Sequence, residues 1–410
     1  MLIEMKNNFK ISKYGPIWFP LLVIIFYSNT FTRELALIII IFYTLLGLKQ
    51  IIQSFFLIWF LLALNPEIVQ MGNNINIFRY LIFFAGLISC LIHCKFKKID
   101  YFIFFIILFL MLTVLHSIFF SAFPSVSILK IINWALIMSI LYLSWSGLDL
   151  KDEEKVQRWL TNFLISIMFL SVFTFFFQKI GFSKNVDYFQ GILRHPQALG
   201  ITLSVLIIIL FGKIISEVGF NKFLIFYLIV ALLLLILTNS RTSIFSTFFV
   251  LIGYLIFLFT SKIFKKKILF KYINKFSYTL LIILIIFIII NLNRVESKWE
   301  EISIFNLLKN YETSRKILYE PMLQNIQNNF FSGIGFGISS DPSFLKISRD
   351  PFFGIPFKAP VEKGITFLMI LEELGIFGFF LFSVWLIFLF YKTKKNGSVP
   401  MLLFFNVILL

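Results

Sequence analysis

Apolar stretches of about membrane-spanning length follow one another along almost the whole chain. A helix that crosses a bilayer needs about 20 mostly apolar residues, because inside lipid every backbone polar group must be paired within the helix. Such stretches lie near residues 17–31, 34–48, 51–64, 77–94, 101–120, 128–147, 159–179, 197–212, 223–238, 243–261, 276–291 and 365–391. They predict an all-α, polytopic membrane helical bundle with about 12 transmembrane helices.

The composition excludes an ordinary soluble enzyme. Apolar types make up 59% of the 410 residues and charged types only 14%, which is typical of integral membrane proteins. We therefore treat residues 1–410 as a single integral membrane domain. The final stretch, 400–410, is apolar but too short to cross. Either it ends half-embedded or it is part of a thirteenth span.

The short loops between the stretches define an orientation, because Lys and Arg near the ends of spans stay on the cytoplasmic side. Loops that follow an even number of crossings carry the following basic residues: Lys6, Lys10, Lys13, Lys49, Lys95, Lys97, Lys98, Lys151, Lys155, Arg158, Lys213, Lys222, Lys262, Lys265, Lys266, Lys267, Lys271, Lys392, Lys394 and Lys395. A single topology with both ends inside satisfies all of them. It predicts a multi-pass membrane protein with a cytoplasmic N-terminus and an uncleaved first span.

The net charge of +17 then needs no nucleic-acid partner, because most of the excess lies in scattered cytoplasmic loops facing anionic headgroups. The sequence "DLKDEEK", 149–155, is expected to be a solvated cytoplasmic loop. Cys90, His93 and Cys94 in "CLIHC" lack the further ligands that a metal site needs. We therefore expect no metal and no cofactor.

Polar residues on the opposite, outer face gather in three places. Residues 187–200 contain Arg194 and His195, and residues 237–246 contain Arg241. The third place is one long extracytoplasmic loop, about 293–364, which contains Arg294, Glu296, Arg315, Glu320, Arg349 and Glu362. In so apolar a chain, charged side chains at one end of the bundle indicate a functional site.

The same loop contains "NNFFSGIGFG", residues 328–337, with glycines at 333, 335 and 337. Glycine runs cradle nucleotides in some proteins, but this one follows eleven crossings, outside the nucleotide supply, and lacks the lysine of a P-loop. We expect Gly333, Gly335 and Gly337 to shape the loop by letting the backbone turn tightly and approach its neighbours or a glycan.

An enzyme on the outer face must use a donor that was activated inside and carried across, and lipid pyrophosphates are the common kind. Arginine suits such a donor, since its guanidinium stays protonated and grips phosphate oxygens bidentately. The same grip would stabilise the charge that develops on a departing pyrophosphate.

Three segments carry a family resemblance: "SRTSIFS" after a span, "ETSRKILYEPMLQNIQNNFFSGIGFG" in the long loop, and "EKGITFLMILEELGIFGFFLF" opening a span. In order and spacing they resemble the O-antigen polymerase and O-antigen ligase superfamily, which are multispanning glycosyltransferases of the bacterial envelope. The resemblance covers roughly residues 185–391.

The resemblance implies that Arg241 and Arg315 bind the pyrophosphate of an undecaprenyl-linked glycan, with Arg194 as a further substrate-binding residue. The alternative for Arg241 is an interfacial anchor at a helix end. For Arg315 it is a surface salt bridge with Glu312 or Glu320.

Ligases of this family place a histidine before the last "L-x-E-x-G-x-x-G" stretch, and here Gly364 stands in its place. Glu362 is therefore the candidate catalytic base, with a solvated loop glutamate as the alternative. His195 is the second candidate base; its alternative is a residue at the start of a helix. Glu373, inside the signature, is expected to orient the loop or to pair with an arginine, or else to be a carboxylate at a helix start.

The resemblance and the missing histidine favour a polymerase that joins undecaprenyl-pyrophosphate-linked repeat units by one inverting displacement, without metal or nucleotide. The alternatives are a ligase that transfers glycan to lipid A core or to protein, another outward-facing glycosyl transfer, and a lipid-linked oligosaccharide flippase. The implied partners are the lipid-linked glycans, membrane lipids, a chain-length regulator and a flippase.

Overall fold

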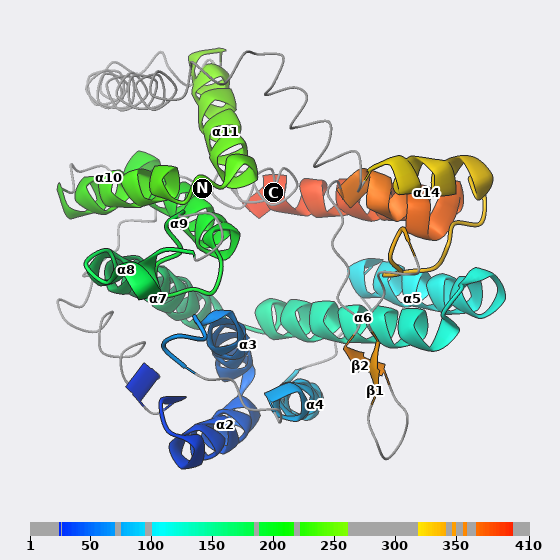
Figure 1. Cartoon of the computed structure of the whole chain (residues 1–410), viewed down its shortest axis with the longest axis horizontal. Helices are drawn as coiled ribbons and strands as arrows, with labels where there is room; N and C mark the ends of the chain where they lie inside the picture. Colours follow the sequence, from blue (N-terminus) through cyan, green and yellow to red (C-terminus); the bar gives the residue numbers. More distant parts are fainter. Residues whose placement is uncertain are drawn as a thin grey trace. The chain divides into compact units, whose positions relative to one another are not determined.

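The protein is described by a computed structural model that covers residues 24–25, 27–69, 75–94, 101–183, 188–216, 222–260, 319–341, 347–349, 356–358 and 366–396. Its helices are α2 (Thr30–Leu45), α3 (Leu48–Ala63), α4 (Ile75–His93), α5 (Tyr101–Phe120), α6 (Pro124–Ser146), α7 (Leu150–Thr174), α8 (Gln178–Gly181), α9 (Pro196–Ser216), α10 (Lys222–Leu237), α11 (Arg241–Thr260) and α14 (Thr366–Asn396) (Figure 1). A further helical segment covers 319–328.

The prediction of a polytopic helical membrane protein is confirmed. Five helical stretches within the described residues are long and apolar enough to cross a membrane: 103–120, 124–146, 150–174, 196–214 and 367–391. The stretches expected between 34 and 261 and at 365–391 coincide with helices. Those at 276–291 and 400–410, and most of 17–31, lie outside the described residues. The total of 12 or 13 spans therefore stays a prediction.

The described residues form two compact units, and each is treated by itself. Unit 1 combines Met1–Lys95, Ile140–Phe259 and Lys392–Leu410, while unit 2 combines Phe96–Ser139 and Thr260–Tyr391. Unit 1 therefore contains α2 to α4 and α7 to α11. Unit 2 contains α5, most of α6, the helical segment 319–328, a short strand pair and most of α14.

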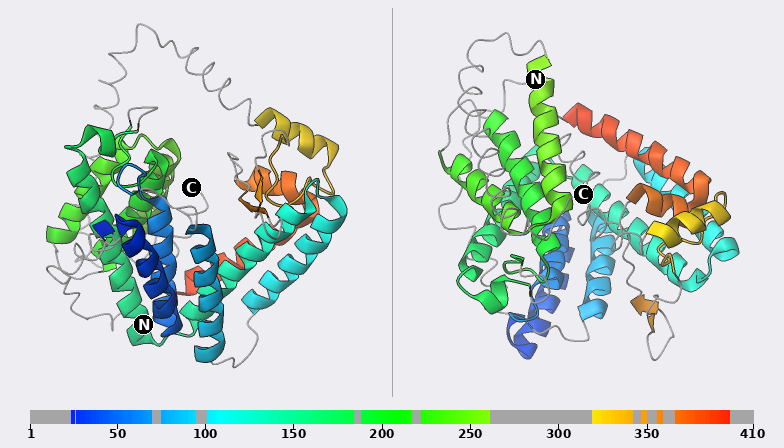
Figure 2. Two further views of the ribbon diagram at one scale, coloured as in Figure 1. Left: turned by 60° about the horizontal axis from the view of Figure 1, so that its bottom comes forward. Right: turned by 45° about the horizontal axis from the view of Figure 1, so that its top comes forward.

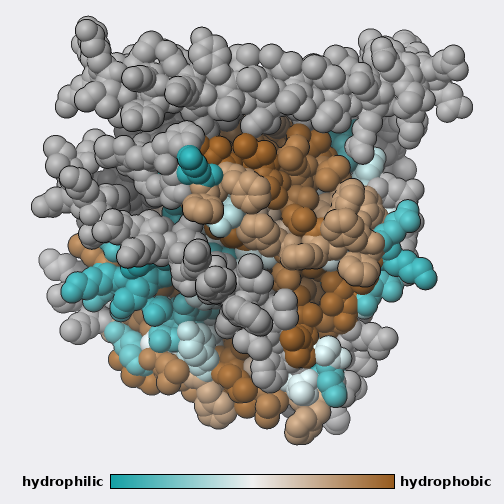
Figure 3. Space-filling view, turned by 90° about the vertical axis from the view of Figure 1, so that its left-hand side faces the viewer, coloured by the Kyte–Doolittle hydropathy of each residue, from teal (hydrophilic) through white to brown (hydrophobic). Residues whose placement is uncertain are grey.

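Helix α9 is the central element of unit 1. Its residues Leu203, Leu206 and Leu210 are fully buried, and it packs against both α10 and α7. Helix α10, by contrast, exposes Phe223 and Phe226 on its outer side. Much of the described surface seen in Figure 3 is apolar in the same way. Large exposed apolar side chains are the expected surface of a helix bundle that has lipid as its solvent.

Unit 2 is built on the hairpin of α5 and α6. Phe109 of α5, Ile131 of α6, and Ile370 and Leu374 of α14 form its buried apolar cluster. The yellow segment 319–328 lies beside the orange first part of α14 in both views of Figure 2. The apolar cluster therefore joins α14, which follows the long loop in the sequence, to a hairpin more than 200 residues earlier.

A two-stranded antiparallel sheet departs from the all-α expectation. Strands β1 (Ser348–Arg349) and β2 (Pro356–Lys358) pair within the predicted long loop, with Ser348 opposite Lys358. So short a pair is stabilised by its surroundings more than by its own hydrogen bonds. Two or three residues are also too few to leave a clear pattern in the sequence. Arg349, one of the charged residues of the third polar region, lies on β1.

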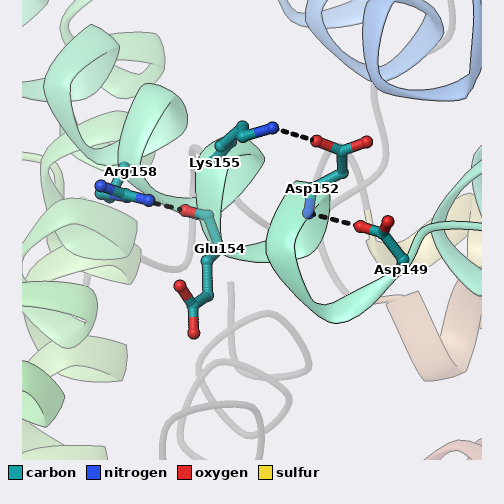
Figure 4. A network of polar contacts seen from close by, with 5 residues as sticks. All are labelled: Asp149, Asp152, Glu154, Lys155 and Arg158. Atoms are coloured by element: carbon teal, nitrogen blue, oxygen red, sulfur yellow. Dashed lines mark hydrogen bonds and ion pairs between the residues drawn. The ribbon is translucent and has the colours of Figure 1, made fainter. Parts of the chain in front are cut away.

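The expectation of a loop at 149–155 was wrong, because α7 begins at Leu150. Figure 4 shows the arrangement: the Asp149 carboxylate accepts from the backbone N–H of Asp152 at 2.8 Å, and Lys155 pairs with Asp152 at 2.7 Å. An acidic N-cap and acidic residues in the first turn satisfy free N–H groups and interact favourably with the helix dipole. The charge cluster that indicated a loop is therefore a helix start.

We expect Asp149→Ala to lower the stability of the protein by about 1 kcal/mol, the usual cost of losing an N-cap side chain. Asp149→Asn retains an oxygen acceptor and is the matched control. Thermal unfolding of both variants in detergent would measure the difference. Equal losses in the two variants would show that the carboxylate does not act as a cap.

Candidate functional site

The glycine run packs against a break in helix α14. The helix is interrupted at Gly375, whose φ and ψ are 65° and −170°. In a continuous helix the N–H of Ile376 would donate to the carbonyl of Glu372. Here it donates to Phe330 O instead, at 3.0 Å. The break therefore leaves backbone groups of α14 available to the loop that precedes it.

The loop uses those groups directly. Ile334 N–H donates to Glu372 O and Gly335 N–H donates to Glu373 O, both at 2.9 Å. Together with the bond between Ile376 and Phe330, these contacts form a short two-way exchange of backbone hydrogen bonds. This exchange satisfies backbone groups that the break in α14 would otherwise leave unpaired.

Glycine is required where the two backbones meet. A Cβ atom on Gly333 would lie 2.5 Å from Glu373 O, and one on Gly375 would lie 2.2 Å from Phe331 O. Both residues also have a φ of 65°, in the left-handed region that favours glycine. Gly335 and Gly337 also have positive φ and lie against Ser121 and Lys130. All three glycines of the run therefore shape the loop by close approach to neighbouring elements.

Two adjacent carboxylates of α14 hold the same loop through their side chains. Glu372 and Glu373 are 0% and 2% exposed. Glu372 accepts from Asn325 Nδ2 at 2.8 Å and from Ser340 Oγ at 3.0 Å, and Glu373 Oε2 accepts from Gly337 N–H at 2.6 Å. Buried carboxylates are stable only when such donors replace water. Glu373 thus contacts the loop through its side chain.

The α5–α6 hairpin contacts the opposite side of the loop. Lys130 Nζ donates to Gly337 O at 2.5 Å, and Ala122 N–H donates to Ile334 O at 3.3 Å. His116 Nε2 contacts Ser332 O; because a carbonyl only accepts, this nitrogen carries the proton. The loop is therefore hydrogen-bonded both to α14 and to the α5–α6 hairpin.

A second group of predicted residues lies in unit 1, where α9 and α11 begin. His195 is the N-cap of α9, and its Nδ1 accepts from the backbone N–H of Gln197 at 3.2 Å. Gly200 in the next turn of α9 packs so closely on the α10–α11 turn that a Cβ would lie 2.6 Å from Ser240 Cβ. Deeper in the bundle, Ser204 Oγ and Thr247 Oγ1 are 2.6 Å apart. The starts of the two helices therefore lie together.

Arg241 is the first residue of α11 and its side chain is exposed. The turn before it is tight: α10 ends at Leu237, Asn239 has a φ of 51°, and Ser240 N–H donates to Thr238 Oγ1 at 3.2 Å. Two helix starts beside an exposed guanidinium make a region of positive potential, because the positive end of each helix dipole lies at its N-terminus.

Arg194, also exposed, is held near the same helix start by the segment before it. Its own N–H donates to Ala63 O at 2.9 Å, and Asn65 N–H donates to Ile192 O at 2.9 Å. Phe189 N–H donates to Leu237 O at 3.2 Å, where α10 ends. The structure thus brings Arg194, His195 and Arg241 to the end of unit 1 where α9 and α11 begin.

Arg315 and Glu362 lie outside the described residues, so their roles stay predictions. Four residues of the site were not predicted from the sequence: Glu372, Asn325, Ser340 and Lys130. The signal for Glu372 was present, because two adjacent glutamates in the middle of an apolar stretch are costly unless they are paired. Nothing in the sequence indicated that Lys130 would meet a loop about 200 residues later.

Among the described residues, no group of three or more His, Cys, Asp or Glu side chains could hold a metal ion. The polar groups instead present arginines, helix starts and hydrogen-bonded carboxylates. These features define a polytopic helical membrane protein with polar sites at helix starts and at the break of α14.

A family model described as "O-Antigen ligase" matches residues 226–383, which include Arg241, the glycine run and the break in α14. This match confirms the resemblance to the O-antigen polymerase and ligase superfamily that was found in the sequence. No curated protein and no solved structure matches the chain.

We expect Gly333→Ala and Gly375→Ala each to destabilise the protein by about 2 kcal/mol or more, since each adds a Cβ against a backbone group at positive φ. Gly253→Ala is the matched control, because a Cβ there meets nothing within 4 Å. Thermal unfolding in detergent would measure all three variants. If all three behaved alike, the close approach of the loop to α14 would be disproved.

Proposed function

We propose that the protein is a polymerase that joins undecaprenyl-pyrophosphate-linked oligosaccharide repeat units on the outer face of the bacterial cytoplasmic membrane. The observation that carries this proposal is the superfamily match over residues 226–383, combined with Gly364 at the position of the ligase histidine. The gathering of Arg194, His195 and Arg241 at two helix starts supports a site for an anionic donor.

The proposed reaction is one displacement at the anomeric carbon of the donor glycan, with inversion. A hydroxyl of the terminal sugar on a second lipid-linked unit attacks that carbon. The bond from the carbon to the pyrophosphate oxygen breaks, the hydroxyl proton passes to a base, and undecaprenyl pyrophosphate leaves with the bonding electrons. In this proposal Arg241 and Arg315 hold the pyrophosphate, and Glu362 is the first candidate base.

The capping contact of His195 restricts the role of this residue. A neutral ring that accepts at Nδ1 carries its proton on Nε2. While His195 caps α9, it therefore offers a donor to a phosphate oxygen and not a free lone pair. To act as the base it must first release the N–H of Gln197. We therefore place His195 second to Glu362 as a base and beside Arg194 as a pyrophosphate ligand.

A ligase that transfers finished glycan to lipid A core or to protein is the second candidate, and it is favoured by the family description "O-Antigen ligase". Deleting the gene separates the two functions on a gel of surface polysaccharide. A polymerase deletion leaves single repeats capped on core. Polymer that accumulates on undecaprenyl pyrophosphate would instead establish the ligase.

Arg241→Lys retains the charge but loses the bidentate fork, so we expect glycan transfer to fall by tenfold or more. The deletion strain complemented with this variant should show short glycans on the gel. Arg158→Lys, on α7 at the end expected to be cytoplasmic, is the matched control. Chains of normal length with Arg241→Lys would remove Arg241 from the donor site.

His195→Asn keeps an N-cap acceptor for α9 but has no titratable ring. If His195 is a ligand that donates to phosphate, we expect transfer to fall less than tenfold, with the loss concentrated in the apparent affinity for the lipid-linked donor. His195→Ala, which lacks both the cap and the ring, should lose stability as well. If a stable Asn variant instead turned over about a hundred times more slowly at saturating donor, His195 would be identified as the base.

A further inference from the structure

The loop from Phe330 to Ser340 is oriented by opposite kinds of partner on its two sides. Toward α14 it mainly presents donors: the N–H groups of Ile334, Gly335 and Gly337, and the Ser340 hydroxyl, all meet oxygen atoms of Glu372 or Glu373. Toward α5 and α6 it presents carbonyls, which meet His116, Ala122 and Lys130. The peptide groups of the loop are thus aligned between an accepting side and a donating side.

Gly337 is the residue where the two sides converge. Glu373 accepts from its N–H, and Lys130 donates to its C=O. Hydrogen bonds with an ionised partner are about twice as strong as neutral ones. They are also directional, so a pair of them on one glycine restrains the peptide orientation where the glycine itself would allow many.

These contacts are expensive to form and to lose. Taking the carboxylates of Glu372 and Glu373 out of water is costly unless partners replace the solvent, and removing one partner leaves the other group unsatisfied. Apolar side chains would fill the same space without that cost. The charged groups hold the loop in one position and conformation, which its glycines alone would not do.

We propose that Glu373, Glu372 and Lys130 are positioning residues for glycan transfer, which act by keeping this loop seated in the break of α14. The effect on glycan transfer rests on the proposed function, whereas the contacts that hold the loop do not depend on it. Glu372 extends the hold to Asn325 on the helical segment 319–328. The three residues therefore fix both the glycine run and the helix that leads into it.

A chemical crosslink can test the seating without reference to the reaction. Phe331 on the loop and Phe377 on α14 are each 69% exposed, with ring centroids 6.5 Å apart. Phe331→Cys and Phe377→Cys are introduced together in a background in which Cys90 and Cys94 are replaced by Ser. A short bifunctional thiol reagent should join them in high yield. We expect Glu373→Gln and Lys130→Met to lower this yield several-fold.

Glu154→Gln is the matched control, because Glu154 is exposed on α7 and lies in none of the three polar regions. It should leave the crosslinking yield and glycan length unchanged. An undiminished yield in both Glu373→Gln and Lys130→Met would overturn the inference, since the loop would then be seated without the charged groups.

The crosslink also separates positioning from chemistry. We expect Glu373→Gln to lower transfer tenfold or more, and the crosslink to restore transfer to within about threefold of the crosslinked parent. Failure of a fully crosslinked Glu373→Gln protein to recover would overturn the positioning role. Reduced seating with normal glycan length would overturn it as well, while leaving the proposed function in place. Normal glycans in the deletion strain would remove the proposed function itself.

Discussion

The break of α14 at Gly375 is the constraint on which the rest of unit 2 depends. A continuous helix would use its own carbonyls and would offer the loop only side chains. Because the break redirects Ile376 N–H to Phe330, the carbonyls of Glu372 and Glu373 accept from Ile334 and Gly335. Non-helical backbone inside an apolar bundle is stable only when every freed group finds a partner. The glycine run supplies those partners, and its lack of side chains lets the two backbones come close enough to bond.

The sequence predicted the helical, membrane-spanning class because that prediction depends only on the length of each apolar stretch, which is a local property. It also singled out the polar residues at 187–200 and 237–246, where α9 and α11 begin. It failed at Asp149, where a charge cluster predicted a loop although it caps α7. The strand pair of β1 and β2 was missed because two or three residues leave too little periodicity to detect.

The residues of the candidate site likewise divide into those that the sequence predicted and those that it did not. Family motifs and outward placement singled out Arg241, His195 and Glu373 from the sequence alone. The contact of Lys130 could not be found there, since Lys130 and Gly337 are about 200 residues apart and meet only when the α5–α6 hairpin packs against the loop. Likewise, His195 is identified as a helix cap by its hydrogen bond from the backbone N–H of Gln197. The sequence alone does not distinguish a capping histidine from a catalytic one at this position.

In the proposed reaction the cationic groups lower the activation barrier more than the base does. A general base typically contributes about 10²–10⁴ in rate, whereas stabilisation of developing charge is usually the largest single contribution. Pyrophosphate leaves as an anion, so its departure depends on fixed positive groups more than on a proton. A site with Gly364 in place of the ligase histidine can therefore retain glycosyl transfer if the arginines and helix starts remain. By the same reasoning, our proposal is that the carboxylates of α14, which set the geometry of the loop from Phe330 to Ser340, affect the rate without touching the substrate.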